Sequence, residues 1–196
     1  MKVNPSLKRF LKPYDKNIQK LTFDLRNFIV DTVPEANELI WDNYNAVALA
    51  YSKSKKLKDA FCHIAVYSKH VNFGFNRGVE LINPLIDLNG KGKLIRHISI
   101  RSFESFPTKE IEKMIYEAVG IAEERNPILK QAIIKPASII MSIAKKKIRP
   151  RSLNLYKNNL LVYLASIFFS LLFHISPNLS APLLPYNNPN HFPKLD

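Results

Sequence analysis

The chain has 196 residues, of which 46% are hydrophobic and 23% charged, so it can form one or two domains with a hydrophobic core. This composition excludes wholesale disorder, and the single cysteine excludes a scaffold held together by intramolecular disulfides. The formal net charge of +13 suggests a nucleic-acid partner at first sight, but the charge is unevenly spread.

The charge, glycine and proline contents all change near Arg125. Residues 1–125 hold 20 basic and 15 acidic side chains, a net charge of +5, whereas residues 126–196 hold 9 basic and 1 acidic, a net of +8. All five glycines lie in the first part and eight of the 13 prolines in the second. We therefore expect a domain over 1–125, followed by a different kind of segment.

The first part begins without a continuous apolar run, so we expect no cleaved signal peptide. Residues 17–32 carry apolar side chains at steps of three and four, which predicts an amphipathic helix with Asp15 as its N-cap and Pro34 beyond its end. Residues 108–124 predict a second helix, capped by Thr108. The ranges between them alternate with a period of two and predict strands at 38–41, 46–51, 61–67, 70–75 and 94–101. The order predicts an α+β fold, with a small antiparallel sheet flanked by an N-terminal and a C-terminal helix.

The hairpin of 61–67 and 70–75 can be assigned a register. If Ser68 and Lys69 form its turn, one face is wholly apolar and holds Cys62, Ile64, Val66, Val71, Phe73 and Phe75. The other face holds His63, Ala65, Tyr67, His70, Asn72 and Gly74. In the later strand, Ile98 and Ile100 would face the core, and His97, Ser99 and Arg101 would join the polar face. On the apolar face the Cys62 thiol would be buried, which argues against a cysteine nucleophile.

Three histidines of the polar face, His63, His70 and His97, are candidate metal ligands if their strands are neighbours. The alternative is a half-solvated sheet face with ordinary histidines.

Two further segments are candidate binding elements. Residues 41–45, WDNYN, could line a ligand pocket, or Trp41 could anchor the core ahead of a turn. Residues 90–97, GKGKLIRH, lack the spacing of a phosphate-binding loop and precede a strand. They favour a glycine-rich turn, with an anion contact through Lys91, Lys93 or Arg96 as the alternative.

Three blocks together, IWDNYNAVALAYS, LKDAFCHIAVYSKHVNFGFNRG and GKGKLIRHISIRS, resemble the YdhG-like family (domain of unknown function 1801) over roughly residues 7–124. The resemblance implies a small α+β domain with an antiparallel sheet, and some members are described as frataxin-like intracellular iron chaperones. Frataxin-like iron binding is attributed to an acidic surface, whereas residues 1–125 are basic. The residues that match the family blocks are Trp41, Asp42, Tyr44, Asn45, His63, Tyr67, His70, Asn72, Arg77, Lys93, Arg96 and His97.

The remaining chain reads as a basic linker or helical segment at 126–152, a hydrophobic helix at 153–176 and a disordered Pro- and Asn-rich tail at 177–196. The apolar run 160–175 would span about 24 Å as a helix, short of a bilayer core of about 30 Å. It could be a membrane anchor that leaves residues 1–150 in the cytoplasm, because basic residues precede it. It could instead be a tail of no selected structure, produced by an altered reading frame or readthrough, or a helix that packs on a partner.

These patterns predict a small cytoplasmic binding protein rather than an established enzyme. Metal handling, with iron suggested by the resemblance alone, is the first hypothesis. The second is binding or turnover of a small molecule in a cleft around Trp41, Tyr44 and Arg96, with Asp42, Asn45, Tyr67, Asn72, Arg77 and Lys93 as further candidates. A nucleic-acid partner is disfavoured because no interleaved basic and aromatic platform is recognisable. The oligomeric state stays open.

Overall fold

The computed structural model describes residues 1–82, 84–131, 135–148 and 150. Three α-helices are present in this part of the chain: α1 (Pro5–Leu11), α2 (Lys16–Thr32) and α3 (Thr108–Arg125). Short 3-10 turns occur at Leu57–Asp59, Gly78–Glu80 and Pro127–Lys130.

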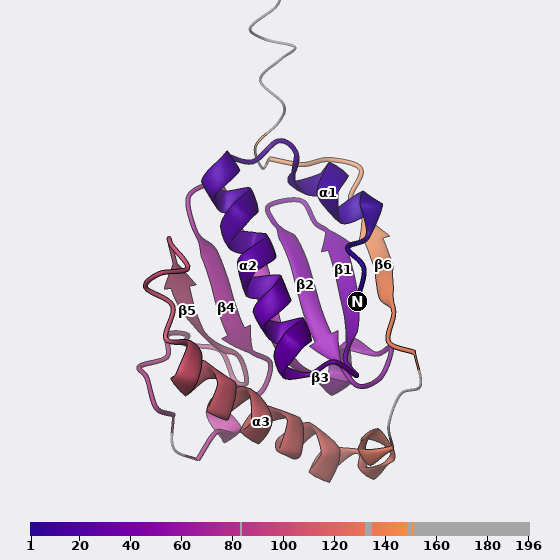
Figure 1. The fold of residues 1–196 in the computed structure, drawn as a ribbon, viewed down its shortest axis with the longest axis vertical. Helices are drawn as coiled ribbons and strands as arrows, with labels where there is room; N and C mark the ends of the chain where they lie inside the picture. Colours follow the sequence, from indigo (N-terminus) through magenta and orange to yellow (C-terminus); the bar gives the residue numbers. More distant parts are fainter. Residues whose placement is uncertain (83, 132–134, 149, 151–196) are drawn as a thin grey trace, which may run out of the picture. The chain divides into compact units, whose positions relative to one another are not determined.

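Six strands form one twisted sheet in the order β5-β4-β3-β2-β1-β6 (Figure 1). Their bounds are β1 Asn37–Asp42, β2 Val47–Ser52, β3 Ala60–Val66, β4 Val71–Phe75, β5 Arg96–Ile100 and β6 Ser138–Ile143. Neighbours from β1 to β5 are antiparallel, whereas β6 runs parallel to β1. The α+β class is confirmed, and the sheet is mixed rather than wholly antiparallel.

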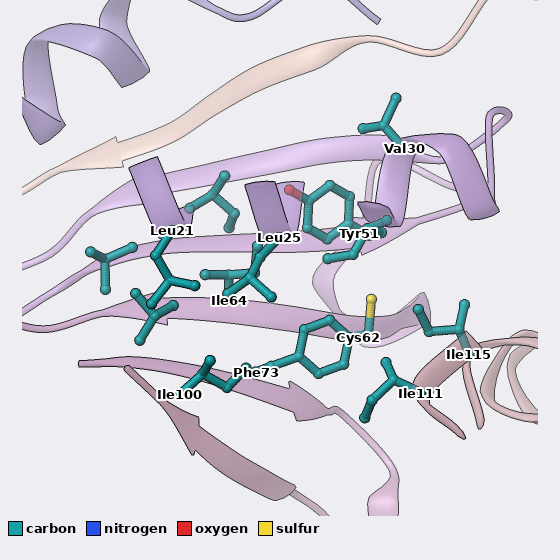
Figure 2. Packing of buried hydrophobic residues seen from close by; sticks show 14 of the residues in the cluster. Leu21, Leu25, Val30, Tyr51, Cys62, Ile64, Phe73, Ile100, Ile111 and Ile115 are labelled. Carbon is teal, nitrogen blue, oxygen red and sulfur yellow. The ribbon is translucent and has the colours of Figure 1, made fainter. Parts of the chain in front are cut away.

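All three helices contribute apolar side chains to a core on one face of the sheet, the face that α2 crosses in Figure 1. Figure 2 shows Leu21 and Leu25 of α2 above the strands and Ile111 and Ile115 of α3 beside Cys62. Cys62 is fully buried, and burial raises the pKa of its thiol well above the ordinary value. The opposite face is not covered by a helix among the described residues, and we call it the open face.

The hairpin register is as predicted: Cys62 pairs with Phe75, Ile64 with Phe73 and Val66 with Val71. The β5 pairing also follows the prediction, because Ile98 and Ile100 lie opposite Phe73 and Val71 of the core face. Wholly apolar faces explain this success, since a slip of one residue would expose every core side chain. Helix α2 begins as predicted, with the Asp15 carboxylate accepting from the Asn17 amide at 2.8 Å.

The Thr108 cap was wrong. The N-cap position of α3 is Pro107, and no side-chain hydrogen bond caps the helix. Thr108 is instead the first helical residue, so its hydroxyl is not placed to accept from the first free amides.

The predicted boundary at Arg125 is also not a boundary of the fold. Residues 126–152 were expected to be a linker or helical segment, but Pro127–Lys130 forms a 3-10 turn and Ser138–Ile143 adds strand β6 beside β1. The compact unit accordingly runs from Met1 to Ser152.

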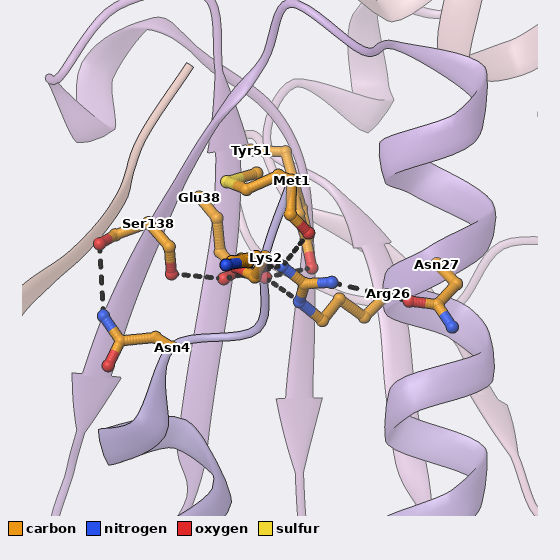
Figure 3. Close-up of polar contacts among 8 residues, drawn as sticks. All are labelled: Met1, Lys2, Asn4, Arg26, Asn27, Glu38, Tyr51 and Ser138. Atoms are coloured by element: carbon orange, nitrogen blue, oxygen red, sulfur yellow. Dashed lines mark hydrogen bonds and ion pairs between the residues drawn. The ribbon is translucent and has the colours of Figure 1, made fainter. Parts of the chain in front are cut away.

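A buried ion pair joins five parts of this unit (Figure 3). Nε of Arg26 on α2 lies 2.7 Å from Oε1 of Glu38 on β1, and both side chains are almost fully buried. Tyr51 on β2 donates to the Glu38 carboxylate at 3.2 Å, and the Ser138 hydroxyl of β6 donates to its other oxygen. Arg26 also donates to the Lys2 carbonyl at 3.3 Å, so the N-terminus, α2, β1, β2 and β6 meet at this ion pair.

The predicted hydrophobic helix at 153–176 and the tail at 177–196 lie outside the described residues. Within residues 1–82, 84–131, 135–148 and 150, no helix is both long and apolar enough to cross a membrane.

Glu38→Leu should lower the free energy of unfolding by about 3–5 kcal/mol, because it leaves the Arg26 guanidinium buried without a counter-charge. The double variant R26M/E38L should lose less than Glu38→Leu alone, since no unpaired charge remains. Urea unfolding of the parent protein, Glu38→Leu, Arg26→Met and the double variant measures these values. A double variant that loses the sum of the two single changes would show that the pair is not coupled.

A chain that ends at residue 130 should be markedly less stable than a chain that ends at residue 152. It lacks Ser138, which donates to Glu38, and the Ala137 amide, which donates to the buried Asn37 side chain at 3.0 Å. Removing such partners from buried polar groups costs about 1–3 kcal/mol each. Comparing the two fragments by urea unfolding tests whether β6 belongs to the domain, and equal midpoints would restore the boundary at Arg125.

Candidate functional site

The open face carries a cavity of about 710 Å³ over β1, β2 and β3. Its floor is formed by small side chains, because Trp41 pairs with Ala48, and Ala50 pairs with His63. A larger residue at Ala48 or Ala50 would fill the space that the two methyl groups leave. The alternation of large and small residues across neighbouring strands therefore produces the hollow.

The walls come from one strand and two loops. Trp41 lines the cavity from β1, Leu57 from the turn before β3, and Leu94 and Ile95 from the loop before β5. These three aliphatic side chains are 40–51% exposed, which is unusual for large apolar groups gathered around one hollow.

Arg96 holds the loop in place. Its Nη1 donates to the Gly92 carbonyl at 2.7 Å and to the Ile95 carbonyl at 2.8 Å. The side chain lies against Gly78, where a Cβ would be 2.5 Å from Arg96 Cβ, so only glycine allows this approach. Arg96 is thus a positioning residue for the loop and not a lining residue.

The open face places one histidine in the cavity in a fixed orientation. Nδ1 of His63 lies 2.8 Å from Asn76 Oδ1, and because an amide oxygen only accepts, Nδ1 carries the proton. In the neutral ring, Nε2 is then an acceptor. The ring lies over Gly74, where an added Cβ would be 2.6 Å from His63 Cε1. Burial lowers the pKa of His63, the hydrogen bond with Asn76 opposes this shift, and nearby His97 adds to it.

Three cations, Lys58, Arg77 and Lys93, also line the cavity, and no acidic residue is among the described residues that line it. Arg77 is ion-paired with Glu80, which leaves most of its guanidinium donors for other partners. Neither lysine makes an ion pair within the part of the chain that the structure describes. The site therefore combines an apolar floor and walls with excess positive charge.

Four of the sequence-predicted residues thus meet here: Trp41, His63, Arg77 and Lys93. Asp42 is fully buried on the core face, where it pairs with Lys147. Tyr44 and Asn45 lie in the exposed turn between β1 and β2. The predicted cleft around Trp41, Tyr44 and Arg96 is therefore corrected to one around Trp41, His63 and Lys93.

The other predicted residues lie further along the sheet. Tyr67 and His70 stack on each other at the β3–β4 turn, with ring centroids 5.0 Å apart. Asn72 accepts from the Ser99 hydroxyl at 2.7 Å. His97 lies on β5 opposite Gly74, on the same sheet face as His63 but with strand β4 between them.

The predicted three-histidine metal site is not assembled. Because His70 is the partner of Tyr67, it lies about 13 Å along the strands from His63. Among the described residues, no three His, Cys, Asp or Glu side chains are close enough to hold a metal ion. Iron prefers such clusters of imidazole and carboxylate, so the residues present do not fit it.

The sequence reasoning missed Asn76, which orients His63, and Lys58 and Leu57, which line the cavity. Asn43, within the predicted segment 41–45, also lines it. A signal for the floor was present in the alternation of Ala48 and Ala50 with core residues. Extending the hairpin register to β2 would have placed both alanines beside His63.

His63→Asn should weaken the dependence of stability on pH below neutrality. Because the folded pKa is below the ordinary 6.5, His63 favours the folded state above about pH 6.5, and this contribution is lost as pH falls through the folded pKa. Asparagine does not titrate and keeps a donor near Nδ1. Urea unfolding of both proteins at pH 8 and pH 5 measures the difference, and an unchanged pH dependence in the variant would contradict the assignment.

The chain was also compared with known proteins. No family model, no curated protein and no solved structure matches it. The YdhG-like resemblance therefore stays a prediction, and the geometry of the site is the guide to function.

Proposed function

We propose that this chain is a binding protein for a small organic molecule with a flat apolar body and one anionic group, held in the open-face cavity. The observation that carries the proposal is the lining itself, which combines Trp41 with Lys58 and Lys93 in one cavity and includes no acidic side chain among the described residues.

The apolar part of such a ligand matches the floor and walls. A volume of about 710 Å³ falls in the range of small-molecule sites, roughly 300–1,000 Å³. A ring system could lie on Ala48 and Ala50, with the Trp41 indole along one edge and Leu94 and Ile95 along another. Burying these exposed aliphatic groups against a ligand would supply most of the affinity.

The polar part of the ligand is constrained by two features. The ammonium groups of Lys58 and Lys93, with the spare donors of Arg77, favour a carboxylate or phosphate at the rim. The Nε2 acceptor of His63 favours a hydroxyl or N–H group on the body of the ligand. Together they predict selection of anions that also carry a hydrogen-bond donor.

A binding role is proposed in preference to catalysis because the strongest nucleophile of this unit, the Cys62 thiol, is buried on the opposite face. We also propose that the chain is a YdhG-like protein of the cytoplasm. The support for that relation is the α+β order of a helix, five antiparallel-paired strands and a second helix over Lys16–Arg125.

The test uses 2-naphthoate and its uncharged match, 2-naphthamide. Trp41 is the only tryptophan, so its fluorescence reports directly on the cavity. We expect naphthoate to quench it at lower concentration than naphthamide, because only the carboxylate gains from the lysines. Absence of saturable quenching by either compound would overturn the proposal.

Variants separate the contribution of the Trp41 ring from that of the Lys93 charge, with binding measured by isothermal titration calorimetry. Trp41→Ala should weaken naphthoate binding by about tenfold or more, as expected for loss of an aromatic anchor. Lys93→Gln should reduce the preference for naphthoate over naphthamide. Lys16→Gln, on α2 across the sheet, is the matched control and should behave as the parent protein; an equal effect of both lysine changes would show that the charge acts only at long range.

A further inference from the structure

We infer that one end of the domain is a docking surface for an anionic lipid bilayer. This surface, here called the basic end, is formed by Arg9 of α1, Tyr44 of the β1–β2 turn, and Ile143, Lys145, Lys146 and Ile148 in and after β6. It is distinct from the cavity on the open face, because none of these residues lines that cavity.

The backbone of the basic end is held firmly. After β6 the chain passes beside α1 and the β1–β2 turn (Figure 1). The Ala144 amide donates to the Asp42 carbonyl and the Ile148 amide to the Tyr44 carbonyl, each at 2.8 Å. Lys147 turns inward, pairs with Asp42 and lies 5.9 Å from the centre of the Phe10 ring. These contacts fix the segment, so its other side chains form a defined surface.

The charge of this surface has one sign. Arg9, Lys145 and Lys146 are exposed, and none makes an ion pair with the residues that the structure describes. Two shallow hollows of about 530 and 370 Å³ meet at Lys147, and the one acidic residue among their described lining is Asp42, which Lys147 neutralises. An anionic surface would therefore meet no unpaired carboxylate among the described residues that line these hollows.

Exposed apolar side chains distinguish a bilayer from other polyanions. Tyr44 is 51% exposed, Ile143 52% and Ile148 67%, and they alternate with the two lysines around the same hollows. Lipid headgroups offer anionic charge above an apolar layer that such side chains can enter. A nucleic acid would instead favour aromatic stacking, and among the described residues of this end Tyr44 is the one exposed aromatic side chain.

The sequence beyond the domain points to the same partner. The described chain ends at Pro150 in the basic end, Arg151 follows, and the apolar run Leu160–Ile175 begins ten residues after Pro150. Basic residues beside an apolar run are typical of the cytoplasmic side of a membrane segment. A lipid-binding end on the domain would place its charged surface against the same leaflet.

The test measures co-sedimentation of the full chain with vesicles of phosphatidylcholine, with or without phosphatidylserine. We expect the phosphatidylserine to strengthen binding, and added salt to reverse the gain. Lys145→Gln with Lys146→Gln should weaken binding to the anionic vesicles by about tenfold or more, since each lysine near such a surface contributes roughly fivefold. Lys109→Gln with Lys113→Gln, on α3 at the other end of the domain, removes the same charge and should have little effect.

Ile148→Ser separates lipid from nucleic acid. It should weaken binding to the anionic vesicles while urea unfolding stays close to that of the parent protein, because the side chain is exposed. Equal binding of the two double-lysine variants would overturn the inference. The inference would also be overturned if the protein bound a DNA duplex more tightly than the vesicles and if Ile148→Ser left that DNA binding unchanged.

Discussion

The ion pair between Arg26 and Glu38 is the constraint on which most of this architecture depends. A carboxylate and a guanidinium are stable in the interior only when their remaining hydrogen-bonding groups have partners. Here Tyr51 and Ser138 bond the carboxylate, and the N-terminal carbonyls bond the guanidinium. Burial and the adjacent Glu38 charge raise the pKa of Tyr51 well above its ordinary value, so its phenol stays protonated and donates. The strand β6 is therefore required by the interior and is not an addition to it.

The two faces of the sheet differ in side-chain size. On the core face, Leu49 and Ile64 fill the space beneath α2, whereas Ala48 and Ala50 leave the open face hollow. Gly74 also leaves space, because it has no side chain where the His63 ring lies and reaches Asn76. A cavity on a sheet can thus arise where small side chains leave space, and not only where large side chains form walls.

The sequence was sufficient for features that local patterns determine. The period of α2 and the apolar faces of β3 and β4 predicted their elements and register, because burial penalises every alternative pairing. It was insufficient where a long-range contact determines the structure. Strand β6 pairs with β1 across about a hundred residues. Asp42 looked like a site residue beside Trp41, but it faces the opposite side of the strand. Trp41, His63, Arg77 and Lys93 were found, whereas Asn76 was missed because its role appears only when His63 is placed.

The buried thiol of Cys62 makes its alkylation rate a measure of how often the core opens. It is the only cysteine in the chain, and its position between the sheet and α3 shields it from any reagent in solution. Alkylation can then proceed only through molecules in which the core has opened, so the labelling rate at a given reagent concentration counts these rare openings. Ligands of the open face and lipids at the basic end would each slow that rate to the extent that they bind the closed form.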